Sequence, residues 1–131
     1  MKTRFVLLIC LSLAFAGCKK DVQTVQVCFE NQSMWDFTNV IINDKYSISG
    51  LQKGYTSQFI VFDNYKLHNN KPEPENFSAQ IASNTRLAFV QSNQPLPGES
   101  IAQLKPGTYT VVITSGYFTN SSNTYIRFEF K

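Results

Sequence analysis

Apolar residues in this chain recur at every second position over short stretches, and that period constrains the fold more than any other feature. Val25, Val27 and Phe29 share one face of a stretch whose opposite face carries Gln26 and Cys28. A period of two is typical of a β-strand with one buried face, because successive side chains point to opposite sides. No later stretch shows the 3.6-residue period of an amphipathic helix. The sequence therefore predicts an all-β protein.

Strand-like stretches follow one another at regular spacing, with turn-forming residues between them. They cover 22–29, 37–42, 46–48, 57–67, 77–82, 85–91, 109–114 and 124–130. Both faces of 57–67 are apolar, which favours a central strand or one whose outer face is also covered. In the last stretch Ile126, Phe128 and Phe130 are expected to face the core. About seven to eight short antiparallel strands of this kind predict a β-sandwich.

The first eighteen residues have the layout of a secretory signal. Lys2 and Arg4 form a basic start, an apolar run covers 5–15, and two small residues then precede Cys18. The apolar run is shorter than the roughly 20 residues that span a bilayer. An uncleaved transmembrane helix is therefore the weaker interpretation.

A cysteine at the predicted cleavage site resembles the lipobox of bacterial lipoproteins. In that motif the thiol is acylated, the peptide is cut before the cysteine, and the new amino terminus is acylated too. Ala16, Gly17 and Cys18 match the motif, whereas Phe15 stands where Leu, Val or Ile is usual. Secretion without lipid is the alternative, and it requires the position of Cys18 to be a coincidence. We therefore predict that Cys18 carries lipid of the palmitate type.

These features divide the chain into a signal peptide (1–17), a lipidated cysteine with a short tether (18–24), and one β-sandwich domain (25–131). Removing the signal leaves 114 of the 131 residues, which is enough for a single core. The tether spans only about 20 Å, so the domain is expected close to its membrane. Loss of Lys2 and Arg4 lowers the net charge from +3 to +1. No basic stripe remains, so no nucleic-acid partner is expected.

Cysteine usage excludes an intrachain disulfide in the predicted mature protein. Cys10 leaves with the signal and Cys18 carries lipid, so Cys28 stands alone. Its place in an alternating strand favours an inert buried thiol. A reactive nucleophile is the alternative, but no base lies near it in the sequence to activate it. The core must therefore be stable through burial alone.

The segment Leu104-Lys105-Pro106-Gly107-Thr108-Tyr109 is the strongest single indication of the fold. Pro106 and Gly107 predict a tight turn, and Leu104 is expected to plug the end of the core. The Tyr109 hydroxyl can bond back to the backbone. The segment resembles the start of a late strand in immunoglobulin-like and transthyretin-like sandwiches.

The lipobox-like start is followed by three further patterns. These are Phe-x-Asn-Val-x-Ile-Asn over 37–43, Gly-Leu-x-x-Gly-x-x-Ser over 50–57, and the segment over 104–109. In this combination the chain resembles the small uncharacterised β-sandwich lipoproteins of Bacteroidetes-type bacteria. The Cys18-Lys19-Lys20-Asp21 start is similar to that group as well. The resemblance implies the fold and a lipid-anchored place in the outer membrane, on its periplasmic face or at the cell surface. It implies no activity.

Residues able to support catalysis or metal binding are few. The one histidine, His68, is predicted to lie in an exposed loop over 68–76, and no Gly-x-Ser-x-Gly turn frames a serine nucleophile. No metal or other cofactor is expected, because the chain has no histidine pair, Cys-x-x-Cys or Asp-x-Asp-x-Asp loop. Calcium oxygens could come from Asp36, Asn39, Asn43 and Asp44, for which turn formation is the preferred interpretation. We therefore expect a protein that is not an enzyme, with a small hydrolase using His68 as the least favoured alternative.

Aromatic residues that alternation does not place are the remaining candidates for a site. Trp35 and Asp36 precede a strand, and Tyr117 and Phe118 lie in a polar loop predicted over 115–123. Exposed aromatic rings beside Asn and Ser can stack on sugars or form protein hot spots. The alternative is that these rings cap the open ends of the sandwich. We predict a monomeric binding or accessory module for an envelope protein or a glycan, with a structural or adhesive envelope component as the alternative.

The lipid prediction is tested directly by metabolic labelling with palmitate. We expect the wild-type chain to take up label and Cys18→Ala to take up none, because that substitution removes the acylated thiol. Cys28→Ala is the matched control and should label like the wild type. Equal label in Cys18→Ala and the wild type would contradict the lipoprotein interpretation.

Overall fold

A computed structural model of the protein describes residues 23–92, 95–117 and 124–131. These ranges form ten strands and contain no helix, which confirms the prediction of an all-β protein. The strands are β1 (Val25–Asn31), β2 (Phe37–Ile42), β3 (Tyr46–Leu51), β4 (Ile60–Phe62), β5 (Lys66–His68), β6 (Asn76–Ile81), β7 (Asn84–Ser92), β8 (Ile101–Gln103), β9 (Gly107–Tyr117) and β10 (Thr124–Phe130). A search of the described ranges finds no helix with the length and apolar character needed to cross a membrane.

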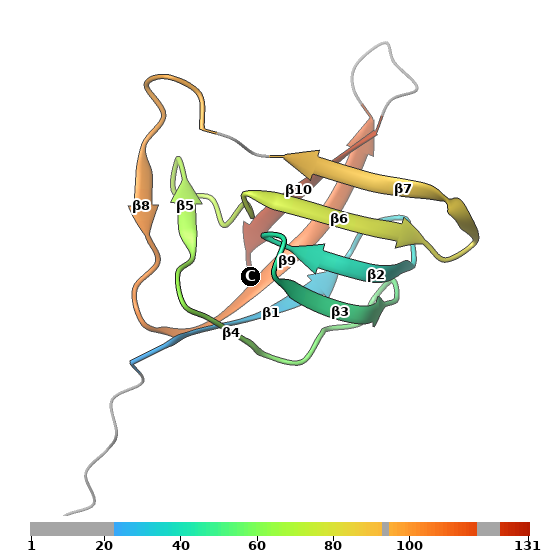
Figure 1. Ribbon diagram of the computed structural model, residues 1–131, viewed down its shortest axis with the longest axis horizontal. Coiled ribbons are helices and arrows are strands. Elements are labelled where there is room, and N and C mark those ends of the chain that lie inside the picture. Colours follow the sequence, from blue (N-terminus) through green and yellow to red (C-terminus); the bar gives the residue numbers. More distant parts are fainter. Residues whose placement is uncertain (1–22, 93–94, 118–123) are drawn as a thin grey trace, which may run out of the picture.

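Eight strands form two four-stranded sheets that face each other across one core (Figure 1). The first sheet has the order β10-β9-β1-β4 and the second β3-β2-β6-β7. Strands β5 and β8 pair separately, beside the two sheets. The pairing is antiparallel throughout except between β1 and β9, which run parallel from Val25 opposite Gly107 to Asn31 opposite Ile113.

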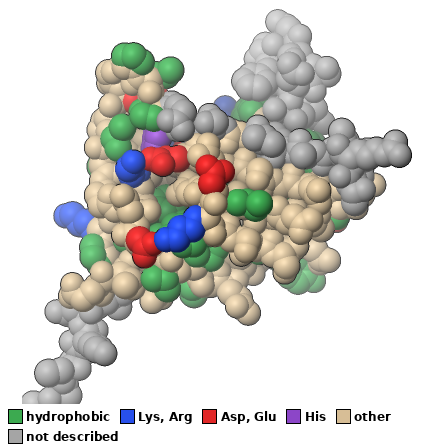
Figure 2. All heavy atoms as spheres, viewed as in Figure 1, with side chains coloured by type: hydrophobic (Ala, Val, Ile, Leu, Met, Phe, Trp, Pro, Cys, Tyr) green, Lys and Arg blue, Asp and Glu red, His purple; other side chains and the backbone are tan. Residues whose placement is uncertain are grey.

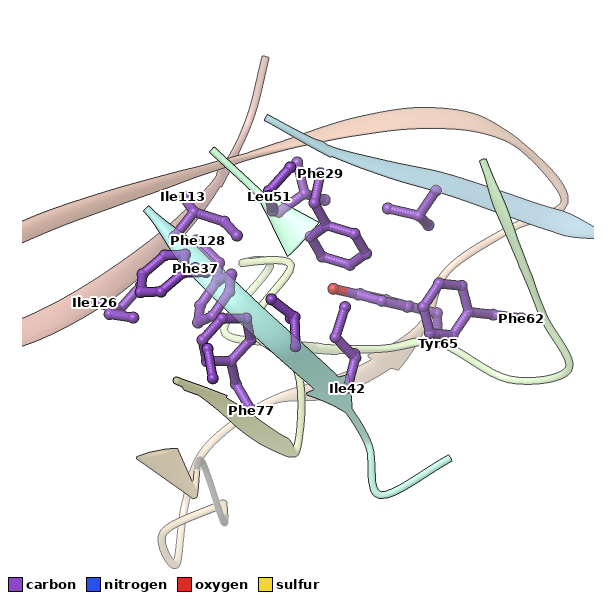
Figure 3. Packing of buried hydrophobic residues seen from close by; sticks show 14 of the residues in the cluster. Phe29, Phe37, Ile42, Leu51, Phe62, Tyr65, Phe77, Ile113, Ile126 and Phe128 are labelled. Carbon is purple, nitrogen blue, oxygen red and sulfur yellow. The ribbon is translucent and has the colours of Figure 1, made fainter. Parts of the chain in front are cut away.

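The core is built from the inward residues of both sheets (Figure 3). Rings meet across it in edge-to-face or tilted contacts, which aromatic pairs favour. Phe128 of the first sheet lies 5.3 Å from Phe77 of the second, centroid to centroid, and Tyr46 lies 4.3 Å from Phe62. Each buried side chain of this size contributes about 1.5–3 kcal/mol. Burial of this kind stabilises the body without any cross-link, because Cys28 is buried and unbridged.

The segment that leads into β9 does what its sequence predicts. Leu104 is 6% exposed and belongs to the core cluster. Gly107 begins the strand, and the Tyr109 hydroxyl donates a hydrogen bond to the backbone carbonyl of Lys105 (3.0 Å). This hydrogen bond links Tyr109 in β9 to the turn at Pro106 and Gly107 that precedes it.

The prediction of a central strand over 57–67 is wrong. The stretch holds two short strands, β4 and β5, and β4 lies at the edge of its sheet. Phe62 is buried and Ile60 half-buried, but Phe59 is 53% exposed and Val61 51% exposed, so the outer face is not covered. Apolar residues on both faces of a strand do not place it at the centre, because its position depends on which strands pair with it.

Three further expectations fail for related reasons. His68 ends β5 and is only 5% exposed, and Pro72 and Pro74 are also buried, so 68–76 is not an exposed loop. Phe130, expected in the core, is 39% exposed at the end of β10. Strand β9 continues through Tyr117, where a loop was predicted from 115 onward. The burial of a residue and the length of a strand depend on contacts with segments distant in sequence, which local patterns do not show.

A buried asparagine joins the two sheets by hydrogen bonds. The Nδ2 amide of Asn31 in β1 donates to the carbonyls of Trp35 and Leu51, both at 2.8 Å, and Leu51 ends β3 of the other sheet. Its Oδ1 accepts from the N–H (3.0 Å) and the hydroxyl (2.6 Å) of Ser33. All four bonds lie in or next to the core, where an unpaired polar group costs about 1–3 kcal/mol. Asn31 therefore fixes the turn after β1 and the end of β3 together.

We expect Asn31→Ala to lower the free energy of unfolding by about 2 kcal/mol or more, because it takes away the partner of the Leu51 carbonyl and of the Ser33 N–H. Gln32→Ala is the matched control. Gln32 is exposed and its side chain bonds only to Glu30, so we expect a loss below about 0.5 kcal/mol. Urea denaturation of both variants measures the difference, and equal small losses would show that the buried network is unimportant.

Candidate functional site

The predicted site residue Trp35 is held by the turn that Asn31 organises. Its N–H donates to the Ser33 hydroxyl (3.2 Å), and its ring is half-buried, 6.3 Å from Phe37. It packs against the core cluster. Asp36 is exposed, and its Oδ1 accepts from the N–H of Lys53 (2.8 Å). Trp35 packs on the core and Asp36 bonds to the backbone of a neighbouring turn. These contacts favour the interpretation that Trp35 caps an end of the sandwich.

The other predicted site residues are only partly within the described ranges. The backbone of Tyr117 ends β9 opposite Thr124, while Phe118 and the lipidation candidate Cys18 lie outside the described residues. Strand β9 and the Trp35 turn do meet, because the N–H of Met34 donates to the Ser115 hydroxyl (3.0 Å). The structure therefore brings the two predicted aromatic segments to the same end of the body.

Two of the candidate calcium ligands, Asn43 and Asp44, form the turn between β2 and β3. Asn39, Asn43 and Asp44 have left-handed backbones, with φ of 48°, 52° and 56°. Asn43 Oδ1 accepts from the backbone N–H of Asn76 and Asp44 Oδ2 from its side-chain amide. Within the described residues no group of three or more His, Cys, Asp or Glu side chains is placed to hold a metal. Asn39 instead lies within β2 at an irregularity in its pairing with β6, and its side-chain amide donates to Gln80 Oε1 (2.7 Å).

His68 is buried at the end of β5. Its backbone pairs with Ile101 of β8 and exchanges hydrogen bonds with Lys71. The Nε2 atom has no hydrogen-bond partner in the part of the chain that is described. A histidine that acts as a general base needs a nucleophile within hydrogen-bond reach, and none is held there. The described residues do not assemble a catalytic pair around it.

Charged side chains gather around a small pocket of about 220 Å³ between the β2–β3 turn and the segment after β4. Lys45 pairs with Asp63, and Lys66 with Glu75 at 2.6 Å. The hydrogen bond from Lys45 holds the pKa of Asp63 below its ordinary value. Figure 2 shows basic and acidic side chains side by side on this face instead of a patch of one sign. The charges compensate each other, so the pocket does not select for a charged ligand.

The larger opening is a groove of about 610 Å³ between the edge strand β3 and the segment that leads into β4. Its lining contains no charged side chain: Ser47, Ile48, Ser49, Gly50, Thr56, Ser57, Gln58, Phe59 and Ile60. Hydroxyls and an amide lie beside two half-buried isoleucines and the exposed ring of Phe59. Its volume lies in the range of sites that bind small ligands or side chains. We call this surface the β3–β4 groove.

The groove is closed at both ends by contacts between the sheets. At one end the ring of Tyr46 packs on Phe62, and at the other Asn31 bonds to the carbonyl of Leu51. On the opposite side of the body the gap is bridged, because Gln91 of β7 accepts from the N–H of Ile126 in β10 (3.4 Å). The two sheets are thus joined at the β7–β10 side. At the β3–β4 side they are open between the Tyr46–Phe62 contact and the Asn31–Leu51 bond.

Sequence reasoning missed the β3–β4 groove because it treated 57–67 as a central strand. One signal was available: the segment 46–51 contains neither charge nor proline. Natural edge strands usually carry such residues as protection against pairing with other chains. An unprotected strand beside the exposed ring of Phe59 is the pattern that would have indicated this surface.

Comparisons with known proteins add no assignment to this geometry. No protein-family model, no curated protein and no solved structure matches the chain.

The orphaned nitrogen of His68 gives a stability prediction. We expect His68→Leu to leave the free energy of unfolding unchanged or to raise it by about 1 kcal/mol, because it removes a buried nitrogen that has no partner among the described residues. Tyr65→Phe is the comparison: it deletes the hydroxyl that donates to the Pro72 carbonyl (2.8 Å), and should cost about 1–2 kcal/mol. A large loss on denaturation of His68→Leu would show that the imidazole makes a stabilising contact.

Proposed function

We propose that this protein is a lipid-anchored component of a bacterial outer membrane, and that it binds a protein or glycan partner without catalysis. Its body is then a β-sandwich of the immunoglobulin-like or transthyretin-like type. The lipobox-like start over 1–18 supports the anchor, and the two sheets around one core support the sandwich. The body carries the binding surface.

The observation that carries this proposal is the β3–β4 groove. It combines the exposed ring of Phe59 and the half-buried side chains of Ile48 and Ile60 with hydroxyl groups of Ser47, Ser49 and Thr56. Apolar surface rimmed by polar groups is typical of binding sites for macromolecules. The groove contains no acid, base or metal ligand, so its chemistry suits recognition and not turnover.

A structural or adhesive envelope component is the second candidate, and the open edge of β3 favours it. Such an edge can pair with a strand of another molecule, and repeated pairing builds assemblies. The two candidates differ in their partner: a binding module engages another kind of molecule, whereas an assembly component engages copies of itself.

Photocrosslinking in cells tests the proposal. We expect benzoylphenylalanine in place of Phe59 to give a crosslinked product of discrete mass, because this ring borders the proposed site. The same residue in place of Ile41 is the control, since Ile41 is 41% exposed but lies on β2 and does not line the groove. Equal products at the two positions, or none at Phe59, would contradict the groove as the binding surface. A product with the mass of two copies would support the assembly component instead.

A further inference from the structure

We propose that the β3–β4 groove receives an extended, uncharged segment of a partner protein, which adds as a strand to the free edge of β3. This inference rests on the proposed function and narrows its partner from a protein or glycan to a protein segment. Strand addition needs unpaired backbone groups on an accessible edge and pockets for alternate side chains.

The free backbone groups of β3 belong to Ser47 and Ser49. The carbonyl of Ile42 accepts from the N–H of Lys45 in the turn, so it points toward β3, and Ile42 pairs with Tyr46. Backbone groups in a strand alternate between its two sides. Those of Tyr46 and Ile48 therefore face β2, and those of Ser47 and Ser49 face away from it. Among the described residues β3 has no strand on that side.

The opposite wall of the groove cannot supply the missing strand. The N–H of Ser57 donates to the carbonyl of Phe29 (2.8 Å), and the N–H of Phe29 donates to the Ser57 hydroxyl (2.9 Å). The carbonyl of Tyr55 accepts from the N–H of Asn31 (2.9 Å). These bonds hold 55–57 against β1, in the first sheet. Within the described ranges the edge of β3 therefore has no partner strand.

The length of the opening sets the size of the occupant. Closure by the Tyr46–Phe62 contact and the Asn31–Leu51 bond leaves 47–50 accessible, and Ser47, Ser49 and Gly50 are exposed. Four residues of strand span about 14 Å. An added segment would form up to about four backbone hydrogen bonds there. Every second side chain of that segment would point onto Ile48 and Ile60.

The charge of the surroundings selects against a charged occupant. None of the nine lining residues is charged, so a charged side chain placed in the groove would be desolvated without a partner. The edge strand β10 differs, because Arg127 and Glu129 lie along it and Lys131 follows it. A glycan could use the serine hydroxyls, but donors and acceptors repeated about every 7 Å along an edge match another peptide backbone.

The test titrates the full chain with a capped peptide of about seven alternating threonine and valine residues, a typical strand length. We expect the amide resonances of Ser47 and Ser49 to shift. Ser49→Pro should weaken binding about tenfold or more, since it removes an outward N–H without breaking the ladder to β2. Ser49→Ala keeps that N–H and should bind within about twofold of the wild type. A peptide with N-methylated central residues should not bind.

Several outcomes would overturn strand addition. One is binding that Ser49→Pro leaves unchanged, and another is equal binding of the N-methylated peptide. Amide shifts with a neutral oligosaccharide but not with the peptide would assign the groove to a glycan. Self-association in sedimentation that Ser49→Pro abolishes would make a second copy the occupant. If the peptide does not bind but the crosslink at Phe59 still forms, strand addition is wrong and the proposal of a binding module remains. If the peptide does not bind and no crosslink forms, both proposals are wrong.

Discussion

The buried carboxamide of Asn31 holds the two sheets together where apolar packing alone would leave polar groups unpaired. Its amide reaches the carbonyl that ends β3, and its oxygen fixes the turn that carries Trp35. A side chain that satisfies both its donors and its acceptor inside a core specifies one arrangement of the neighbouring segments. Because the thiol of Cys28 is unbridged, no covalent bond shares this task. The position of β3 relative to β1 therefore follows largely from one residue.

The same residue explains why the groove has a defined end. From Leu51 the edge of β3 runs free until Tyr46, where the ring contact with Phe62 joins the sheets again. Two fixed points separated by an open stretch produce a slot of constant length instead of a flexible gap. Such preorganisation lowers the cost of ordering a site when a ligand binds. The groove is thus a consequence of how the body is closed, and does not depend on mobile loops.

The sequence predicts the period of the strands well and their neighbours poorly. Alternation identifies the buried face of β1, and the Leu104 to Tyr109 pattern predicts both a plug and a tyrosine bond that the structure contains. Local patterns do not reveal that β1 and β9 run parallel, or that β4 lies at an edge. Both facts depend on pairing between segments far apart in the chain. The same limit applies to the candidate site. The sequence identifies Trp35 as an aromatic residue outside the alternation, but only the fold shows that it packs on the core.

An edge strand without charge or proline is a hazard to a protein that folds alone, since it invites pairing with other copies. The chain does protect itself elsewhere. At β10 the gap to β7 is bridged by Gln91, and Glu30 at the end of β1 forms an ion pair with Lys131 at 2.6 Å. The contrast with β3 is therefore local, and it coincides with the groove and with the exposed ring of Phe59. An undefended edge is explained where pairing is useful, so the proposed strand addition accounts for the lack of charge and proline along β3.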